Sequence, residues 1–183
     1  MRLKVLLLLV VISAQIMSDD VFSQNTINTK DTVTASLKIN SDLDTVYRSF
    51  NNTNMRILPP KGFVPFSNGR VSGFVNTGTA ASIVGAQYPE TPYVGFYDAM
   101  AQKAFNKAGN AELTGERSAH TYSGRPAKFY FYTLRSEGVK VRRILFFTGD
   151  EYQMVFLQAN YPASFDALIR QIIMESFLTV EYE

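Results

Sequence analysis

Residues 127–160 contain three consecutive segments in which bulky apolar and polar residues are arranged as they are in β-strands. The segments are 127–135, 139–148 and 151–160, and only the short turns Ser136-Glu137-Gly138 and Gly149-Asp150 separate them. Strands that are joined by turns this short pair with each other in antiparallel fashion. The pattern therefore predicts a three-stranded antiparallel meander.

The length of the two turns determines the register of this meander. If Glu137-Gly138 and Gly149-Asp150 are both two-residue turns, Arg143 lies opposite Tyr132 on one neighbouring strand and opposite Phe156 on the other. Apolar side chains then collect on both faces of the sheet instead of on one. A sheet of this kind needs other elements to cover it on both sides.

Two amphipathic helices are predicted to supply this cover. Residues 92–108 carry an apolar stripe at helical spacing, with Thr91 as the cap and Pro92 at the first helical position. Residues 163–176 carry a second apolar stripe that follows Pro162. The predicted fold class is therefore α+β, an antiparallel sheet with helices packed on its faces in an αβα sandwich.

The remaining segments are predicted to extend the sheet and to add one short helix. Alternation and flanking turn residues predict strands at 32–40, 55–58, 71–75, 81–87 and 111–121, with a further edge strand at 178–182. The apolar spacing in residues 43–50 predicts a short helix that Ser41 caps and that ends at Asn51-Asn52. Pro59-Pro60 should end the strand at 55–58, because neither proline can donate a backbone hydrogen bond.

The N-terminus has the pattern of a secretory signal peptide. Arg2 and Lys4 precede an unbroken apolar run at 5–12, which is too short to span a bilayer. Cleavage after Ser23 fits best, with Ala14 and Ser18 as alternatives. The predicted organisation is a signal peptide at 1–23, a polar arm at 24–31 and a single α+β domain at 32–183. We expect an exported protein, soluble in the periplasm or secreted, with no stable membrane span after cleavage.

Composition excludes several classes of function. None of the 183 residues is a cysteine, which excludes disulfides, thiol nucleophiles, cysteine zinc sites and lipid attachment to an N-terminal cysteine. The formal net charge of +2 is too small for a protein that binds duplex nucleic acid, so no nucleic-acid partner is expected. Nothing in the sequence indicates a cofactor or a metal, and the oligomeric state is not predicted.

The order of elements and several turns resemble a known family. The turn Pro59-Pro60-Lys61-Gly62-Phe63, the Gly149-Asp150 hairpin and the Tyr161-Pro162 pair before the apolar positions Leu168 and Ile172 look like the Mog/PsbP-like superfamily, including its small exported bacterial members. The resemblance covers about residues 55–182 and leaves 32–50 as an addition. It implies a mainly non-catalytic protein that binds other proteins. No partner-contact residue of the family can be matched to this chain.

The candidates for catalysis are few. His120 is the only histidine, so a hydrolytic triad would need it, yet no G-x-S-x-G motif is present. Asp150 and Glu151 lie at a predicted hairpin tip, where acidic residues serve as turn formers. The glycines form no phosphate-binding loop. A structural or merely exposed His120 is therefore the preferred interpretation.

Four basic residues of the meander are the candidate partner or ligand surface. In the predicted register Arg135 lies opposite Lys140, and Arg142 follows on the same face, so like charges gather at one end of the sheet. An acidic partner or ligand would explain this cluster, and a solvated rim is the alternative. Arg143 lies between two aromatic residues in the predicted register. It either packs against these rings or lines a pocket.

The preferred function is an exported, non-catalytic binding or accessory protein of the cell envelope, whose partner is another envelope or secreted protein. Two alternatives remain. One is a hydrolase-like enzyme that uses His120 as its base. The other is an envelope accessory protein that recognises a small anion, with Arg142 among the candidate contacts.

Overall fold

The computed structural model describes residues 42–51, 53–69, 71–107 and 111–183. The predicted signal peptide, the polar arm and the predicted strand at 32–40 lie outside the described residues. Within the described ranges, no helix is both long enough and apolar enough to cross a bilayer.

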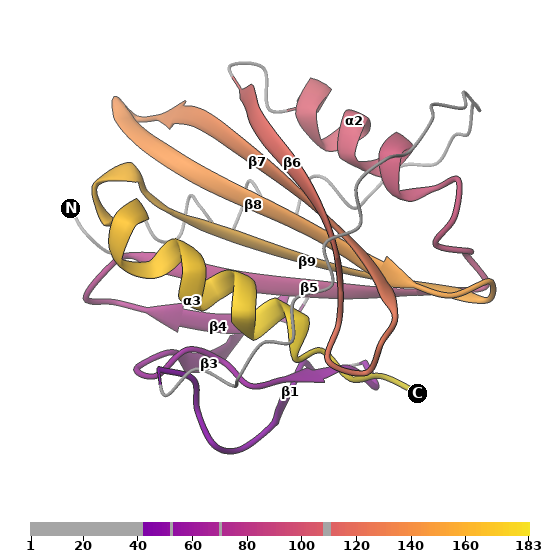
Figure 1. Cartoon of the computed structure of the whole chain (residues 1–183). Coiled ribbons are helices and arrows are strands. Elements are labelled where there is room, and N and C mark those ends of the chain that lie inside the picture. Colours follow the sequence, from indigo (N-terminus) through magenta and orange to yellow (C-terminus); the bar gives the residue numbers. More distant parts are fainter. Residues whose placement is uncertain (1–41, 52, 70, 108–110) are drawn as a thin grey trace.

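A seven-stranded antiparallel sheet forms the centre of the molecule (Figure 1). Its strand order is β3-β4-β5-β9-β8-β7-β6, so the meander β7-β8-β9 lies between the β3-β4-β5 strands and the edge strand β6. The strands are β3 Val64–Ser67, β4 Ser72–Asn76, β5 Ala81–Pro89, β6 Glu112–His120, β7 Pro126–Ser136, β8 Val139–Gly149 and β9 Gln153–Pro162. The predicted strands from residue 71 to residue 160 are all present.

One helix covers each face of the sheet, as the apolar pattern of the meander predicted. Helix α3 (Asp166–Leu178), which follows the 3-10 turn η1 (Ala163–Phe165), lies across one face, and α2 (Tyr97–Lys107) lies on the other (Figure 1). The core beneath α3 includes Phe129, Phe131, Ile144, Phe146, Val155, Leu157, Ile173 and Phe177. The core beneath α2 includes Tyr130, Leu145, Phe147, Met154, Phe156, Ala101 and Ala104. The α+β prediction is confirmed.

The first hairpin of the meander has the predicted register, and the second does not. Tyr132 is the partner of Arg143 across β7 and β8, as expected. Across β8 and β9, however, the partner of Arg143 is Asn160 instead of Phe156. Gly149 still belongs to β8, and the turn residues are Glu151 and Tyr152. The observed register of β8 and β9 differs from the predicted one by an even number of residues. Each side chain therefore still points to the face of the sheet that was predicted for it.

The predicted helix at 43–50 is wrong. Residues 42–51 instead form a loop with the short strand β1 (Arg48–Ser49), which pairs with β2 (Arg56–Ile57). The Asp44 carboxylate accepts the backbone N–H groups of Thr45 and Val46, and this local turn competes with a helix. Val46, which the helical pattern placed on the buried stripe, is 59% exposed.

Two further predicted elements are shorter in the structure. Helix α2 begins at Tyr97 and not at Pro92, because the Tyr93 N–H donates to the Asp150 carbonyl and holds this segment against the β8-β9 turn. The predicted edge strand at 178–182 is only an isolated bridge between Arg56 and Glu181. Both segments are fixed by backbone hydrogen bonds to distant parts of the chain, which local periodicity does not reveal.

Thr179, at the end of α3, connects this helix by hydrogen bonds to the backbone of Leu58. Its Oγ1 accepts the Leu58 N–H at 2.9 Å and donates to the Ser176 carbonyl at 2.6 Å. The Ser176 hydroxyl donates to the Leu58 carbonyl at 2.7 Å. All these groups are buried, so each depends on its protein partner in place of water.

We expect Thr179→Val to lower the free energy of unfolding by about 1–3 kcal/mol, because it leaves the buried Leu58 N–H without an acceptor while keeping the side-chain shape. Urea denaturation of the purified protein measures this. Thr77→Val, at an exposed loop position, is the matched control and should change stability by less than about 0.5 kcal/mol. Equal effects of the two substitutions would contradict the role assigned to Thr179.

Candidate functional site

The structure places the four candidate basic residues on two different faces of the sheet. Arg135 and Lys140 are paired across β7 and β8, as predicted, and both side chains are exposed. They lie beside the β7-β8 turn, on the face that α3 covers. Neither forms a salt bridge with a carboxylate of the described residues. We call Arg135 and Lys140 the basic edge. Two like charges directly opposite each other destabilise a strand pair.

Arg142 lies on the same face but has partners within the protein. Its guanidinium donates to the Thr133 hydroxyl, and its Nε lies 3.6 Å from Oδ2 of Asp166 at the start of α3. The same carboxylate accepts the Tyr161 hydroxyl at 2.8 Å and lies 3.7 Å from Nη1 of Arg170. Burial raises the pKa of Tyr161, and its hydrogen bond to Asp166 raises it further. Arg142 thus helps to hold the N-terminus of α3 on the sheet.

Arg143 lies on the opposite face, beneath α2, and is only 2% exposed. Its Nε donates to Oδ1 of Asn160 at 2.7 Å. Its Nη1 and Nη2 atoms are buried without a hydrogen-bond partner. Burial lowers the pKa of Arg143 to about 10, and burial also raises the pKa of the neighbouring Tyr132 to about 12. The predicted contact with Phe156 as a cross-strand pair is replaced by the Asn160 pair.

A row of polar residues crosses the sheet at this point. Tyr132, Arg143, Asn160 and Ser82 are successive cross-strand partners on β7, β8, β9 and β5. All four are buried, in a layer that is otherwise mostly apolar. Sequence analysis identified Arg143 but missed Asn160 and Ser82. The signal was present as Gln158 and Asn160, two polar residues at alternating positions that point to the same face of an otherwise apolar strand.

Arg143 also lines a narrow crevice between α2 and the sheet. The other lining residues are Ala104, Phe105, Ala111, Tyr132 and Leu145. The space is too narrow to admit a water molecule. The phenol of Tyr132 is directed toward the backbone of α2, where it donates to the Ala101 carbonyl at 3.5 Å. The crevice therefore combines one unpaired guanidinium with apolar and aromatic walls.

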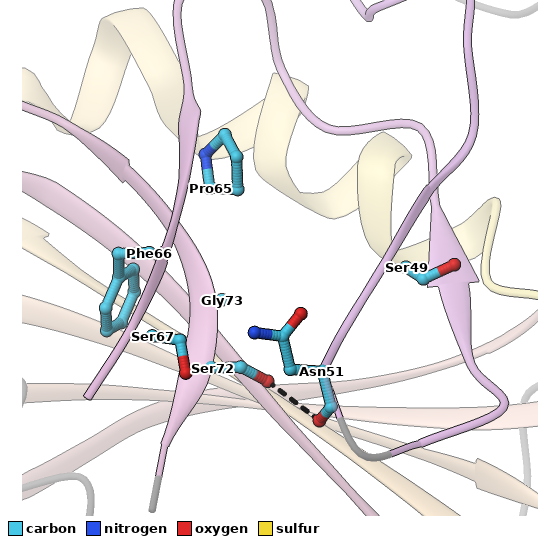
Figure 2. A pocket seen from close by; sticks show the side chains of 7 residues that line it. All are labelled: Ser49, Asn51, Pro65, Phe66, Ser67, Ser72 and Gly73. Atoms are coloured by element: carbon cyan, nitrogen blue, oxygen red, sulfur yellow. Dashed lines mark hydrogen bonds between the residues drawn. The ribbon is translucent and has the colours of Figure 1, made fainter. Parts of the chain in front are cut away.

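A second, open pocket lies between β1 and the β3-β4 hairpin (Figure 2). It has a volume of about 200 Å³, and its lining includes four polar residues, Ser49, Asn51, Ser67 and Ser72. The Ser72 hydroxyl donates to the Asn51 carbonyl at 3.2 Å, and the Asn51 amide points into the open space. None of the lining residues is acidic, basic or histidine, so the lining holds no general base that could activate its serine hydroxyls.

The candidates for catalysis are dispersed. His120 is exposed at the end of β6, where its strand partner is Pro126. Asp150 acts as a turn former, because its Oδ1 accepts the N–H groups of Tyr152 at 2.9 Å and Gln153 at 3.0 Å. No group of three or more histidines or carboxylates in the described ranges is arranged to hold a metal ion.

Comparison with known proteins rests on structure alone, because no protein-family model and no curated protein sequence matches the chain. The chain is similar to the solution structure of PsbP (CyanoP) from Synechocystis sp. PCC 6803, with a TM-score of 0.53 and 13% identity over 82% of this chain and 98% of that chain. It is also similar to LpqN of Mycobacterium tuberculosis, which is involved in cell envelope biogenesis, with a TM-score of 0.52 and 12% identity over 71% of this chain and 84% of that chain.

Identities this low establish a shared fold and carry no residue-level function. The two matches nevertheless extend over most of both chains. The element order, the antiparallel sheet and the helix on each face are those expected from the sequence resemblance. The chain shares the α+β fold of these two proteins.

Proposed function

We propose that this chain is an exported, non-catalytic accessory protein of the cell envelope that binds an acidic surface of another envelope or secreted protein. The observation that carries the proposal is the basic edge, where two exposed cations are direct cross-strand partners. Such an arrangement costs stability in the free protein, and an acidic partner would remove this cost.

The fold and the N-terminal pattern support this proposal. LpqN, which has the same fold, is involved in cell envelope biogenesis. The positively charged N-terminus and the apolar run at 5–12 favour export. The described residues contain no catalytic constellation around His120. An accessory binding role is therefore preferred to the hydrolase alternative.

The exposure of the basic edge makes it accessible to a partner without any change in the fold. Arg135 and Lys140 lie at the end of the β7-β8 hairpin, and the turn residues Glu137 and Gly138 are exposed as well. Interaction of solvent-exposed charges of this kind mainly accelerates association and weakens with salt. The proposed complex should therefore be sensitive to ionic strength.

We expect the double substitution Arg135→Glu and Lys140→Glu to abolish capture of the partner. The measurement is cross-linking of the tagged protein in intact envelopes at low salt, with identification of the proteins recovered. The reversed charges repel an acidic surface and leave the fold intact, because both side chains are exposed.

The control is the double substitution Lys61→Glu and Arg117→Glu, which makes the same change in net charge at two other exposed positions. It should leave the recovered proteins unchanged. If both double variants recover the same proteins as the wild type, the basic edge is not the binding surface.

His120→Ala separates the accessory role from the hydrolase alternative. We expect this variant to restore fully whatever envelope defect follows loss of the gene, since the exposed imidazole forms no hydrogen bond or ion pair with another described residue. The measurement is complementation of a deletion strain at matched protein levels. A variant that is produced normally but fails to complement would favour the enzymatic alternative.

A further inference from the structure

The Arg143 guanidinium has more N–H donors than there are described residues that accept hydrogen bonds from it. A guanidinium carries five N–H groups. In the structure only Nε has an acceptor, Oδ1 of Asn160, while Nη1 and Nη2 are buried and lack one. Arg143 is almost completely buried, with an exposed fraction of 2%. No described residue accepts a hydrogen bond from the two terminal nitrogens.

A buried cation without a counter-charge is one of the least favourable features that a folded protein can carry. No carboxylate of the described residues forms a salt bridge with Arg143. Two polar neighbours are already engaged, because Oδ1 of Asn160 accepts from Nε and the Tyr132 hydroxyl is directed to the Ala101 carbonyl.

The surroundings of the guanidinium indicate which acceptor fits. One cation is present, which matches a singly charged anion. The planar fork of Nη1 and Nη2 matches the two oxygens of a carboxylate. The walls are formed by Ala104, Phe105 and Leu145, which favour an apolar body behind the charged group. Phosphate, with more charge and a stronger need for hydration, fits this lining poorly.

We propose that the crevice between α2 and the sheet is a binding site for a small organic monocarboxylate. The carboxylate pairs with Nη1 and Nη2 of Arg143, and the apolar part of the ligand packs against Leu145 and α2. The half-buried Phe105 ring, whose centroid lies 5.6 Å from that of Tyr132, moves aside to admit the ligand. This site lies on the opposite face from the basic edge, so it is independent of the proposed protein interface.

Paired probes that differ only in charge test the proposal. The protein, expressed from the full-length coding sequence and purified, is titrated with octanoate and with octanamide in a calorimeter. We expect octanoate to bind with one-to-one stoichiometry and octanamide to bind far more weakly, because only the carboxylate supplies the missing charge. Equal binding of the two probes, or no binding of either, would overturn the proposal.

Arg143→Met tests the residue itself, because methionine has a similar shape without the charge. We expect its affinity for octanoate to fall by about 30-fold or more. We also expect its melting temperature without ligand to change little, because removal of the unpaired buried charge offsets loss of the hydrogen bond to Asn160. A much lower melting temperature, with octanoate binding unchanged in the folded fraction, would assign Arg143 to packing alone.

Two controls complete the experiment. Arg135→Met removes an exposed arginine from the other face and should leave octanoate affinity unchanged. Inorganic phosphate at the same concentration should not compete with octanoate. Competition by phosphate, or loss of affinity in Arg135→Met, would show that octanoate binds as a nonspecific counter-ion and would overturn the assignment to the crevice.

Discussion

Burial of both faces of strand β8 is the constraint on which the rest of the structure depends. Leu145 and Phe147 face α2, whereas Ile144 and Phe146 face α3, and all four are almost completely buried. An antiparallel strand with one wet face would need only one covering layer. Here neither helix can be removed without exposing large aromatic side chains to water, so the position of both helices follows from this strand.

The sequence predicts this layered arrangement well, because it depends on periodicity. The first hairpin also has the predicted register, since Glu137 and Gly138 both adopt positive φ, as a two-residue hairpin turn requires. The second turn was misplaced because Gly149 has a different role. A Cβ atom at Gly149 would overlap the Gln153 carbonyl oxygen and the Tyr93 side chain, so this glycine permits close approach within the strand and is not a turn residue.

The candidate sites were less accessible to sequence reasoning than the fold was. Alternation places Arg143 on a face but does not reveal that Asn160 and Ser82 complete a buried polar row, since this depends on the register of two further strands. The partnership of Arg142 with Asp166 depends on where α3 begins relative to β8. The prediction of a helix at 43–50 is wrong for a similar reason. The pairing of β1 with β2 is a contact between two segments, and the spacing of apolar residues within one segment does not predict it.

The adjacent residues Arg142 and Arg143 show that the fold is able to neutralise a half-buried arginine. On the α3 face, Arg142 has Thr133 and the Asp166 carboxylate within reach. On the α2 face, the more deeply buried Arg143 has a single neutral acceptor, Asn160. A methionine or leucine at this position would fill the same apolar layer without the cost of an unpaired charge. The physical account that fits both arginines is that Asp166 supplies the counter-charge of Arg142 and a ligand supplies that of Arg143.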